Sequence, residues 1–135
     1  MDLDFYALQR GEELPPLGVA VSAVDVGAYL EATGESPEAW SEFVPPLQIG
    51  AYALAALMQV LPLPDGALHT GQEFEFLRPV VPGEELATTV RVAQRAERGG
   101  ALFLAFDFDL SDGEGPALRG RSTVVAPLRE GAAAL

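Results

Sequence analysis

Cysteine and lysine are absent from this chain, and histidine occurs once in its 135 residues. The absence of cysteine excludes disulfides, thiolate nucleophiles and thiolate-ligated zinc. A single histidine also excludes a metal site built from several imidazoles. No metal site is expected, and the only imidazole available for chemistry belongs to His69.

Basic side chains are few, because eight arginines face twenty acidic residues and the formal net charge is −12. Nucleic acids and anionic membranes are bound by basic patches that neutralise phosphate groups. This composition lacks such a patch, so neither partner is expected. The acidity is interpreted as colloidal solubility rather than as an acidic binding face.

The sequence also lacks the pattern of a signal peptide or a membrane span. Its start, MDLDFYAL, carries acids where a signal peptide carries Lys or Arg, so a cytoplasmic location is predicted. The longest apolar stretch, residues 45–61, would form a helix roughly 24 Å long. A bilayer crossing needs about 20 apolar residues, and prolines bracket this stretch. We therefore interpret it as a core helix.

That stretch, PPLQIGAYALAALMQVL, is the element around which the rest of the chain is arranged. Its only polar side-chain groups are Gln48, Gln59 and the Tyr52 hydroxyl, so the helix is expected to be wrapped on all sides. Small residues keep it thin enough for a curved sheet to approach closely. They are Gly50, Ala51, Ala53, Ala55 and Ala56.

Before this helix, the sequence predicts an edge segment at residues 5–8, a valine-rich strand from Leu17 and two short helical pieces. Asp25 is expected to cap the first helical piece, and Gly34 is expected to end it. Ser36, followed by a proline and an acid, starts the second piece.

After the loop at residues 61–66, the polarity pattern changes to period two. Apolar residues alternate with polar ones along LHTGQEFEFLRP, TTVRV and ALFLAFDFDL, and ALRGRSTVVAP forms a last strand. These stretches predict half-buried antiparallel strands. A three-residue hairpin loop at residues 98–100 would place Arg91 opposite Asp107 or Asp109.

These elements together predict a single α+β domain spanning residues 1–135. A curved antiparallel sheet of about five strands would wrap around one long buried helix, which is the arrangement of the hot-dog fold. Residues 128–135 are expected to form a frayed tail.

Several stretches resemble MaoC-like hydratases and dehydratases, in the order found in that family. VSAVDVGAYLEATGESP is similar to their helix and the segment after it, and FVPPLQIGAYALAAL resembles their central helix. HTGQEFEFLRPVVPGEEL resembles their next strand and its turn. The resemblance covers about residues 5–127 and is closest to the branch similar to fatty-acid-synthase dehydratases.

The resemblance implies reversible hydration of trans-2-enoyl thioesters to (3R)-hydroxyacyl thioesters, with the acyl group on CoA or a carrier protein. This thioester is the substrate, and no cofactor is expected. A homodimer, or a heterodimer with another hot-dog subunit, is implied as well. The chemistry requires an Asp and a His shortly before the central helix, and a backbone N–H at the helix start that polarises the thioester carbonyl.

The chain departs from this pattern at two places. Glu35 stands where the family has its Asp, and no histidine follows before the central helix. Pro46 has no N–H to offer the carbonyl, which leaves Leu47 or Gln48 as the donor. Glu35 is interpreted either as a general base that holds water or as a solvated loop acid.

His69 is a second candidate for the catalytic group, as a displaced base near a dimer interface. Its strand parity is shared with Glu73 and Glu75, which places it on the polar face unless a bulge at Gly71 shifts the register. The alternative is a structural or surface histidine.

Three further residues are candidates for substrate binding. Gln48 interrupts an apolar helix, so it must meet a thioester carbonyl, a bound water or an internal partner. Arg78 is suited to a phosphate of CoA or of phosphopantetheine, or to a surface ion pair. Tyr52 lies on the same helix as Gln48 and is interpreted as a packing or substrate-contacting residue.

The first functional hypothesis is a MaoC-like protein that binds acyl thioesters and acts as a hydratase or dehydratase, with a partner subunit supplying the missing Asp-His pair. The second is a non-catalytic subunit that holds the acyl chain for a partner. The third is a hot-dog thioesterase in which Glu35 or Glu73 assists the attack of water on the thioester.

Overall fold

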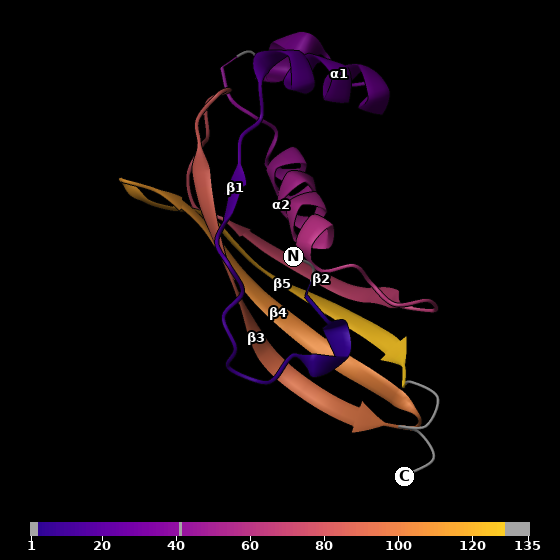
Figure 1. Ribbon diagram of the computed structural model, residues 1–135. Helices are drawn as coiled ribbons and strands as arrows, with labels where there is room; N and C mark the ends of the chain where they lie inside the picture. Colours follow the sequence, from indigo (N-terminus) through magenta and orange to yellow (C-terminus); the bar gives the residue numbers. More distant parts are fainter. Residues whose placement is uncertain (1–2, 41, 129–135) are drawn as a thin grey trace.

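The computed structural model describes residues 3–40 and 42–128, which form one five-stranded sheet in the order β1-β3-β4-β5-β2 (Figure 1). Every neighbouring pair of strands is antiparallel. The strands are β1 (Leu17–Val19), β2 (Leu68–Phe76), β3 (Leu86–Arg98), β4 (Ala101–Asp112) and β5 (Gly115–Pro127). The helices are α1 (Ala23–Thr33) and α2 (Pro46–Val60), with two 3-10 segments, η1 (Phe5–Ala7) and η2 (Pro37–Trp40). The predicted sheet of five antiparallel strands is confirmed.

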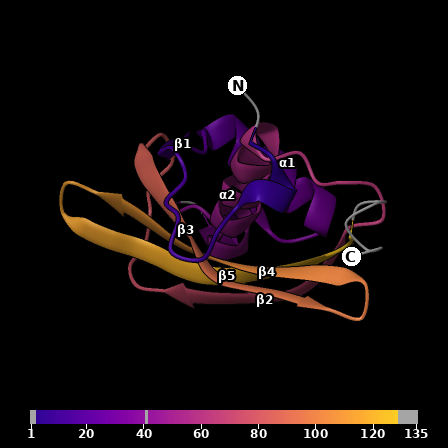
Figure 2. The same ribbon diagram turned by 60° about the horizontal axis from the view of Figure 1, so that its bottom comes forward.

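The predicted central helix is α2, and it lies across one face of the curved sheet while the other face stays uncovered (Figure 2). Proline fixes both of its ends, because Pro46 is its first residue and Pro62 follows its C-cap. Its sheet-facing side is buried and includes Gln48, Ile49, Gly50, Ala53 and Leu57.

The expectation that this helix is wrapped on all sides is wrong for the isolated chain. The side chains of Leu47 and Met58 are 60% and 53% exposed. A sheet covers only one side of a helix, and within the described residues nothing is packed over these two side chains. None of the helices in residues 3–40 and 42–128 is long and apolar enough to cross a membrane.

The N-terminal elements differ in detail from the predicted ones. Ser22, not Asp25, is the N-cap of α1, and Asp25 completes a capping box because its carboxylate accepts a hydrogen bond from the Ser22 N–H. The edge segment predicted at residues 5–8 is a 3-10 turn, η1, at residues 5–7, and β1 has only three residues. Gly34 ends α1 with a φ of 74°, as predicted.

The β3–β4 hairpin sets the register of the sheet. Its loop has two residues, Gly99 and Gly100, with φ values of 58° and 78°, so the predicted three-residue loop is wrong by one residue. Arg91 pairs with Asp107, which is one of the two partners predicted for it. The predicted tail from residue 129 onward lies outside the described residues.

Strand β2 has two features that bear on function. It lies at an edge of the sheet, so one side of its nine residues is unpaired within the described chain. Its pairing with β5 also shifts between His69 and Gly71. Thr70 has no opposite residue on β5 and is the extra residue of a β-bulge.

Candidate active site

The β2 bulge places His69 on the face that carries α2. His69 lies opposite Val124 and Gln72 lies opposite Ser122, and both of these β5 residues are buried under the helix side of the sheet. Residues directly opposite each other in a sheet share a face. The alternative predicted for His69, a bulge near Gly71 that shifts the register, is therefore confirmed, and His69 does not share the face of Glu73.

His69, Gln72 and Ser122 form a hydrogen-bonded cluster on this face. The imidazole Nε2 lies 3.0 Å from Gln72 Oε1, and the buried Ser122 hydroxyl donates to the same oxygen at 2.5 Å. The Gln72 Nε2 group donates to the Glu73 carbonyl at 3.2 Å. Sequence reasoning missed Gln72 and Ser122, although each is a polar residue at an inward position of an otherwise apolar strand face.

The segment leading into α2 carries the other candidate residues. Glu35 follows the end of α1, and its carboxylate accepts a hydrogen bond of 3.0 Å from the Trp40 indole. Gln48 is 1% exposed, and its Nε2 donates to the Asp25 carbonyl at 3.1 Å. The internal partner predicted as one alternative for Gln48 is thus present.

Two polar groups at the start of α2 have no hydrogen-bond partner among residues 3–40 and 42–128. One is the buried Oε1 of Gln48. The other is the N–H of Leu47, because the helix begins one residue earlier and the first N–H groups of a helix have no carbonyl to bond. Both groups would be satisfied by a ligand or a water molecule.

Tyr52 and Arg78 occupy different environments. Tyr52 is half-buried on α2 and packs against the core. Arg78 forms ion pairs of 3.0 Å with Glu84 and 2.7 Å with Asp112, and the hydrogen bond to Glu84 is the main cause of a raised Arg78 pKa. Its guanidinium is thus in the ion pair predicted as one alternative, and phosphate binding by Arg78 stays a prediction.

A single chain does not bring Glu35 and His69 together. The start of α2 lies at the far end of β2, where the Val44 N–H donates to the Val80 carbonyl at 2.7 Å. His69 lies at the near end of the strand, and the eight residues from His69 to Phe76 span roughly 20 Å. Figure 1 shows α1 and the start of α2 at one end of the molecule and the beginning of β2 at the other.

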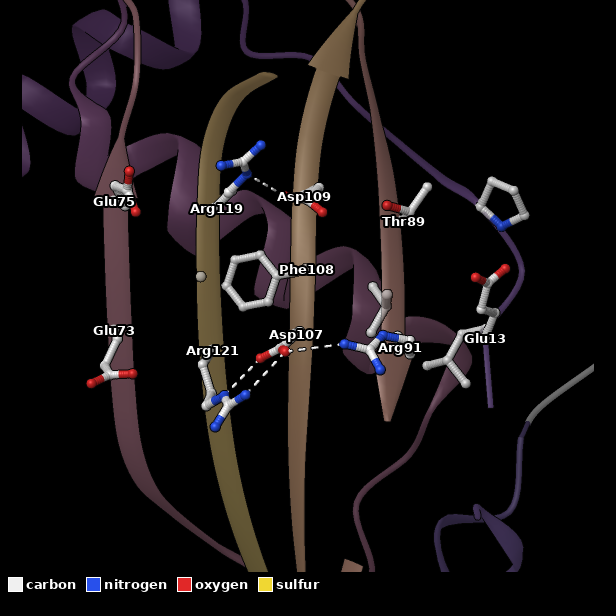
Figure 3. Close-up of a pocket in the computed structure, with 14 residues that line it drawn as sticks. Glu13, Glu73, Glu75, Thr89, Arg91, Asp107, Phe108, Asp109, Arg119 and Arg121 are labelled. Carbon is white, nitrogen blue, oxygen red and sulfur yellow. Dashed lines mark hydrogen bonds and ion pairs between the residues drawn. The ribbon is translucent and has the colours of Figure 1, made fainter. Parts of the chain in front are cut away.

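The uncovered face of the sheet carries rows of charge instead of a catalytic cluster (Figure 3). A shallow hollow of about 700 Å³ lies among them. Arg121 contacts Asp107 through two hydrogen bonds of 2.7 and 3.0 Å, and Arg119 contacts Asp109 at 3.0 Å. The hydrogen bonds from Arg121 lower the pKa of Asp107. Glu73 lies on this face, away from α2.

On this outer face, Asp107 forms ion pairs with Arg121 and Arg91, and Asp109 forms one with Arg119. The described residues contain no group of histidine and carboxylate side chains that could hold a metal ion. The candidate site is therefore on the helix side of the sheet, divided between the start of α2 and the start of β2.

Comparison with known families matches residues 9–117 to the family described as FAS1-like, dehydratase domain region. The match covers most of the chain. The chain belongs to this dehydratase family. A search among curated proteins finds no match for this family member.

Solved structures of MaoC-like hydratases and dehydratases share its fold. The MaoC-like dehydratase from Rhodospirillum rubrum aligns with a TM-score of 0.77 at 20% identity, over 94% of this chain and 98% of that chain. R-hydratase PhaJ1 from Pseudomonas aeruginosa aligns with a TM-score of 0.71 at 20% identity, over 92% and 85% of the two chains. The predicted MaoC-like resemblance and the hot-dog fold are confirmed.

A further relative of this dehydratase-family chain is found in a complex. The structure of the HadBC (3R-hydroxyacyl-ACP dehydratase) complex from Mycobacterium tuberculosis aligns with a TM-score of 0.70 at 18% identity, over 87% of this chain and 96% of that chain. The family match includes Glu35, Gln48, His69 and Gln72, whereas Ser122 lies beyond its end.

Proposed function

We propose that this chain binds an acyl thioester and, paired with a second hot-dog subunit, catalyses reversible hydration of trans-2-enoyl thioesters to (3R)-hydroxyacyl thioesters. Membership of the dehydratase family supports the reaction class. The observation that carries the proposal is the start of α2, where the Leu47 N–H and the buried Gln48 Oε1 are unpartnered among the described residues. A ligand that offers both an acceptor and a donor satisfies them together.

Each residue near the start of α2 has a role in this proposal. The Leu47 N–H donates to the thioester oxygen, where negative charge develops as water adds to C3. The positive end of the helix dipole stabilises the same charge. Gln48 Oε1 accepts a hydrogen bond from the attacking water or from an amide of the pantetheine arm. Glu35 holds the water, and Tyr52 contacts the acyl chain one turn further along α2.

The free edge of β2 supports the proposal that a second subunit pairs with this chain. Pairing along this edge would extend the sheet. A second subunit would also cover apolar side chains that are exposed on α2 and β2, which are Leu47, Met58, Leu68 and Phe76. The subunit is either another copy of this chain or a different hot-dog chain that brings an Asp-His pair.

A non-catalytic acyl-binding subunit is the second candidate function. Glu35 is hydrogen-bonded to Trp40, and among the described residues of the same chain it has no bond to an imidazole. In that case the chain would hold the thioester while a different subunit supplies the chemistry.

The deciding experiment follows crotonyl-CoA with the purified chain, recording loss of the enoyl absorbance and release of thiol in parallel. Loss of the double bond without thiol is expected, and Glu35→Gln should lower the rate by about 10²-fold. Glu31→Gln, an exposed acid on α1, is the matched control and should leave the rate unchanged.

The other outcomes separate the alternatives. Release of thiol would show that the chain is a thioesterase and would refute the proposed hydration. Saturable binding of crotonyl-CoA without turnover would support the non-catalytic subunit. Neither binding nor turnover would refute both functions.

The oligomeric state gives an independent test of the partner. Met58→Glu should convert a dimer to a monomer in light scattering, because it places a charge on the exposed apolar surface of α2. Val24→Glu, on α1 and 82% exposed, is the control and should leave the dimer intact. A wild-type monomer that binds no other hot-dog chain would contradict the proposed pairing.

A further inference from the structure

The orientation of the His69 ring is determined by Gln72. Flipping the Gln72 amide would bring its oxygen against the Glu73 carbonyl, so the nitrogen must face Glu73 and Oε1 must face the other two groups. Oε1 accepts from the Ser122 hydroxyl at 2.5 Å, and it faces His69 Nε2 at 3.0 Å. Since an amide oxygen can only accept, Nε2 carries the hydrogen of the neutral ring.

The other ring nitrogen of His69 is then the basic one. Nδ1 has no hydrogen-bond partner within residues 3–40 and 42–128, and the side chain is exposed beside the free edge of β2. The hydroxyl of Ser122 is buried and is fixed by its own strand, so it limits the movement of Gln72. In the neutral ring, this arrangement leaves the lone pair of Nδ1 available to a group from outside the described chain.

The symmetry of pairing along β2 decides what lies across this edge. Two copies that extend one sheet and keep both α2 helices on the same face are related by a two-fold axis normal to the sheet. Such an axis makes the two β2 strands antiparallel. The His69 end of one strand then lies opposite the Phe76 end of the other.

The Phe76 end of β2 is also where α2 begins. The Val44 N–H bonds to the Val80 carbonyl at 2.7 Å, just beyond β2, and the Phe74 ring contacts Gly50 in the second turn of the helix. Across the pair, His69 of one subunit therefore lies toward the unpartnered Leu47 N–H of the other. Within one chain the two are at opposite ends of the strand.

We propose that His69, oriented by Gln72 and Ser122, is the acid-base residue of a site completed by the start of α2 of a second copy of this chain. The assignment rests on the proposed function. It identifies the imidazole that Glu35 lacks in its own chain. Gln72 is a positioning residue that orients the His69 ring, and Ser122 holds the Gln72 amide in place.

One imidazole can carry out both proton transfers of the reaction. In the hydration direction, Nδ1 accepts a proton from water while the water oxygen forms a bond to C3. The electrons of the double bond move to C2, and the thioester oxygen accepts a hydrogen bond from the second subunit's helix start. The proton held at Nδ1 is then delivered to C2, which returns the neutral ring.

The geometric test uses the absence of cysteine in the wild-type chain. His69→Cys and Leu47→Cys proteins are mixed, subunits are allowed to exchange, and a short bifunctional maleimide is added. The mixture should give a covalent dimer on a denaturing gel, at a yield at least fivefold above either variant alone. Glu75→Cys, on the outer face, replaces Leu47→Cys in the control. Equal cross-linking of His69→Cys alone, or of the control mixture, would overturn the proposed arrangement.

The chemical test separates this assignment from the function on which it rests. With crotonyl-CoA, His69→Ala should lower kcat by at least 10²-fold while KM changes less than threefold. Gln72→Leu should lower kcat by about tenfold with KM nearly unchanged, and Gln94→Leu on β3 is the matched control, which should leave both unchanged. An active wild type with an equally active His69→Ala variant overturns the assignment alone. An inactive wild type overturns the proposed function as well.

Discussion

Gln48→Met is expected to stabilise the folded chain while weakening its binding of the thioester. The Gln48 Oε1 is buried without a partner among the described residues, and an unsatisfied buried acceptor costs about 1–3 kcal/mol. The substitution also removes the 3.1 Å bond from Nε2 to the Asp25 carbonyl, which contributes about 1 kcal/mol. Methionine has a similar length and volume, so packing is retained. The free energy of unfolding should therefore rise by about 0–2 kcal/mol.

The assay is urea unfolding followed by the fluorescence of Trp40, the only tryptophan, at one fixed protein concentration. Gln59→Met, at the exposed far end of α2, is the control and should leave the midpoint within about 0.5 kcal/mol of the wild type. Titration with an acyl-CoA should show about tenfold weaker binding for Gln48→Met, because one hydrogen bond to the ligand is lost.

A fall of more than 1 kcal/mol in the unfolding free energy of Gln48→Met would refute this reasoning. It would mean that the amide oxygen is already satisfied in the free protein. Unchanged thioester binding by Gln48→Met would refute the predicted role in binding, because the Gln48 oxygen would then make no hydrogen bond to the ligand.

Two further predictions concern the sheet. Gly50→Ala should lower the unfolding free energy by about 1–2 kcal/mol, because the new methyl group meets the Phe74 ring, whereas Gly27→Ala on the open side of α1 should raise it by about 1 kcal/mol. Equal urea midpoints for the two variants would contradict this. The pKa of Asp107 is lowered by Arg121, so its stabilisation is present above the usual pKa of about 3.9 and is lost as the pH falls through the lowered value. Asp107→Asn should cost about 1 kcal/mol at pH 7 and progressively less as the pH falls from about 3.9 through the lowered pKa, as measured by urea unfolding at a series of pH values.

The long elements could be predicted from the sequence because strong local signals agree with the tertiary structure there. Prolines delimit α2, and charged residues alternate with apolar ones along β4. The pair Gly99 and Gly100 supplies the positive φ values that a tight hairpin turn requires. The pairing of Arg91 with Asp107 then follows from hairpin register alone.

The features that could not be predicted depend on one-residue choices or on a second chain. Ser22 and Asp25 are both good capping residues, and only the backbone decides which one occupies the cap. The face of the sheet on which His69 lies depends on whether β2 has an extra residue. Gly71 indicates that a bulge can form there, but it does not determine whether one does. The apolar surface of α2 predicted a fully wrapped helix, because composition does not tell whether the cover comes from the same chain.

The bulge at Thr70 has a consequence for how such a site could be gained or lost in evolution. The loop at residues 62–67 precedes β2, and it can absorb a shift of one position at the start of the strand. Residues 71–76 keep their pairing with β5 whichever way the shift goes. Deleting one codon, that for Thr70, would therefore turn the imidazole to the outer face and leave the rest of the gene product unchanged.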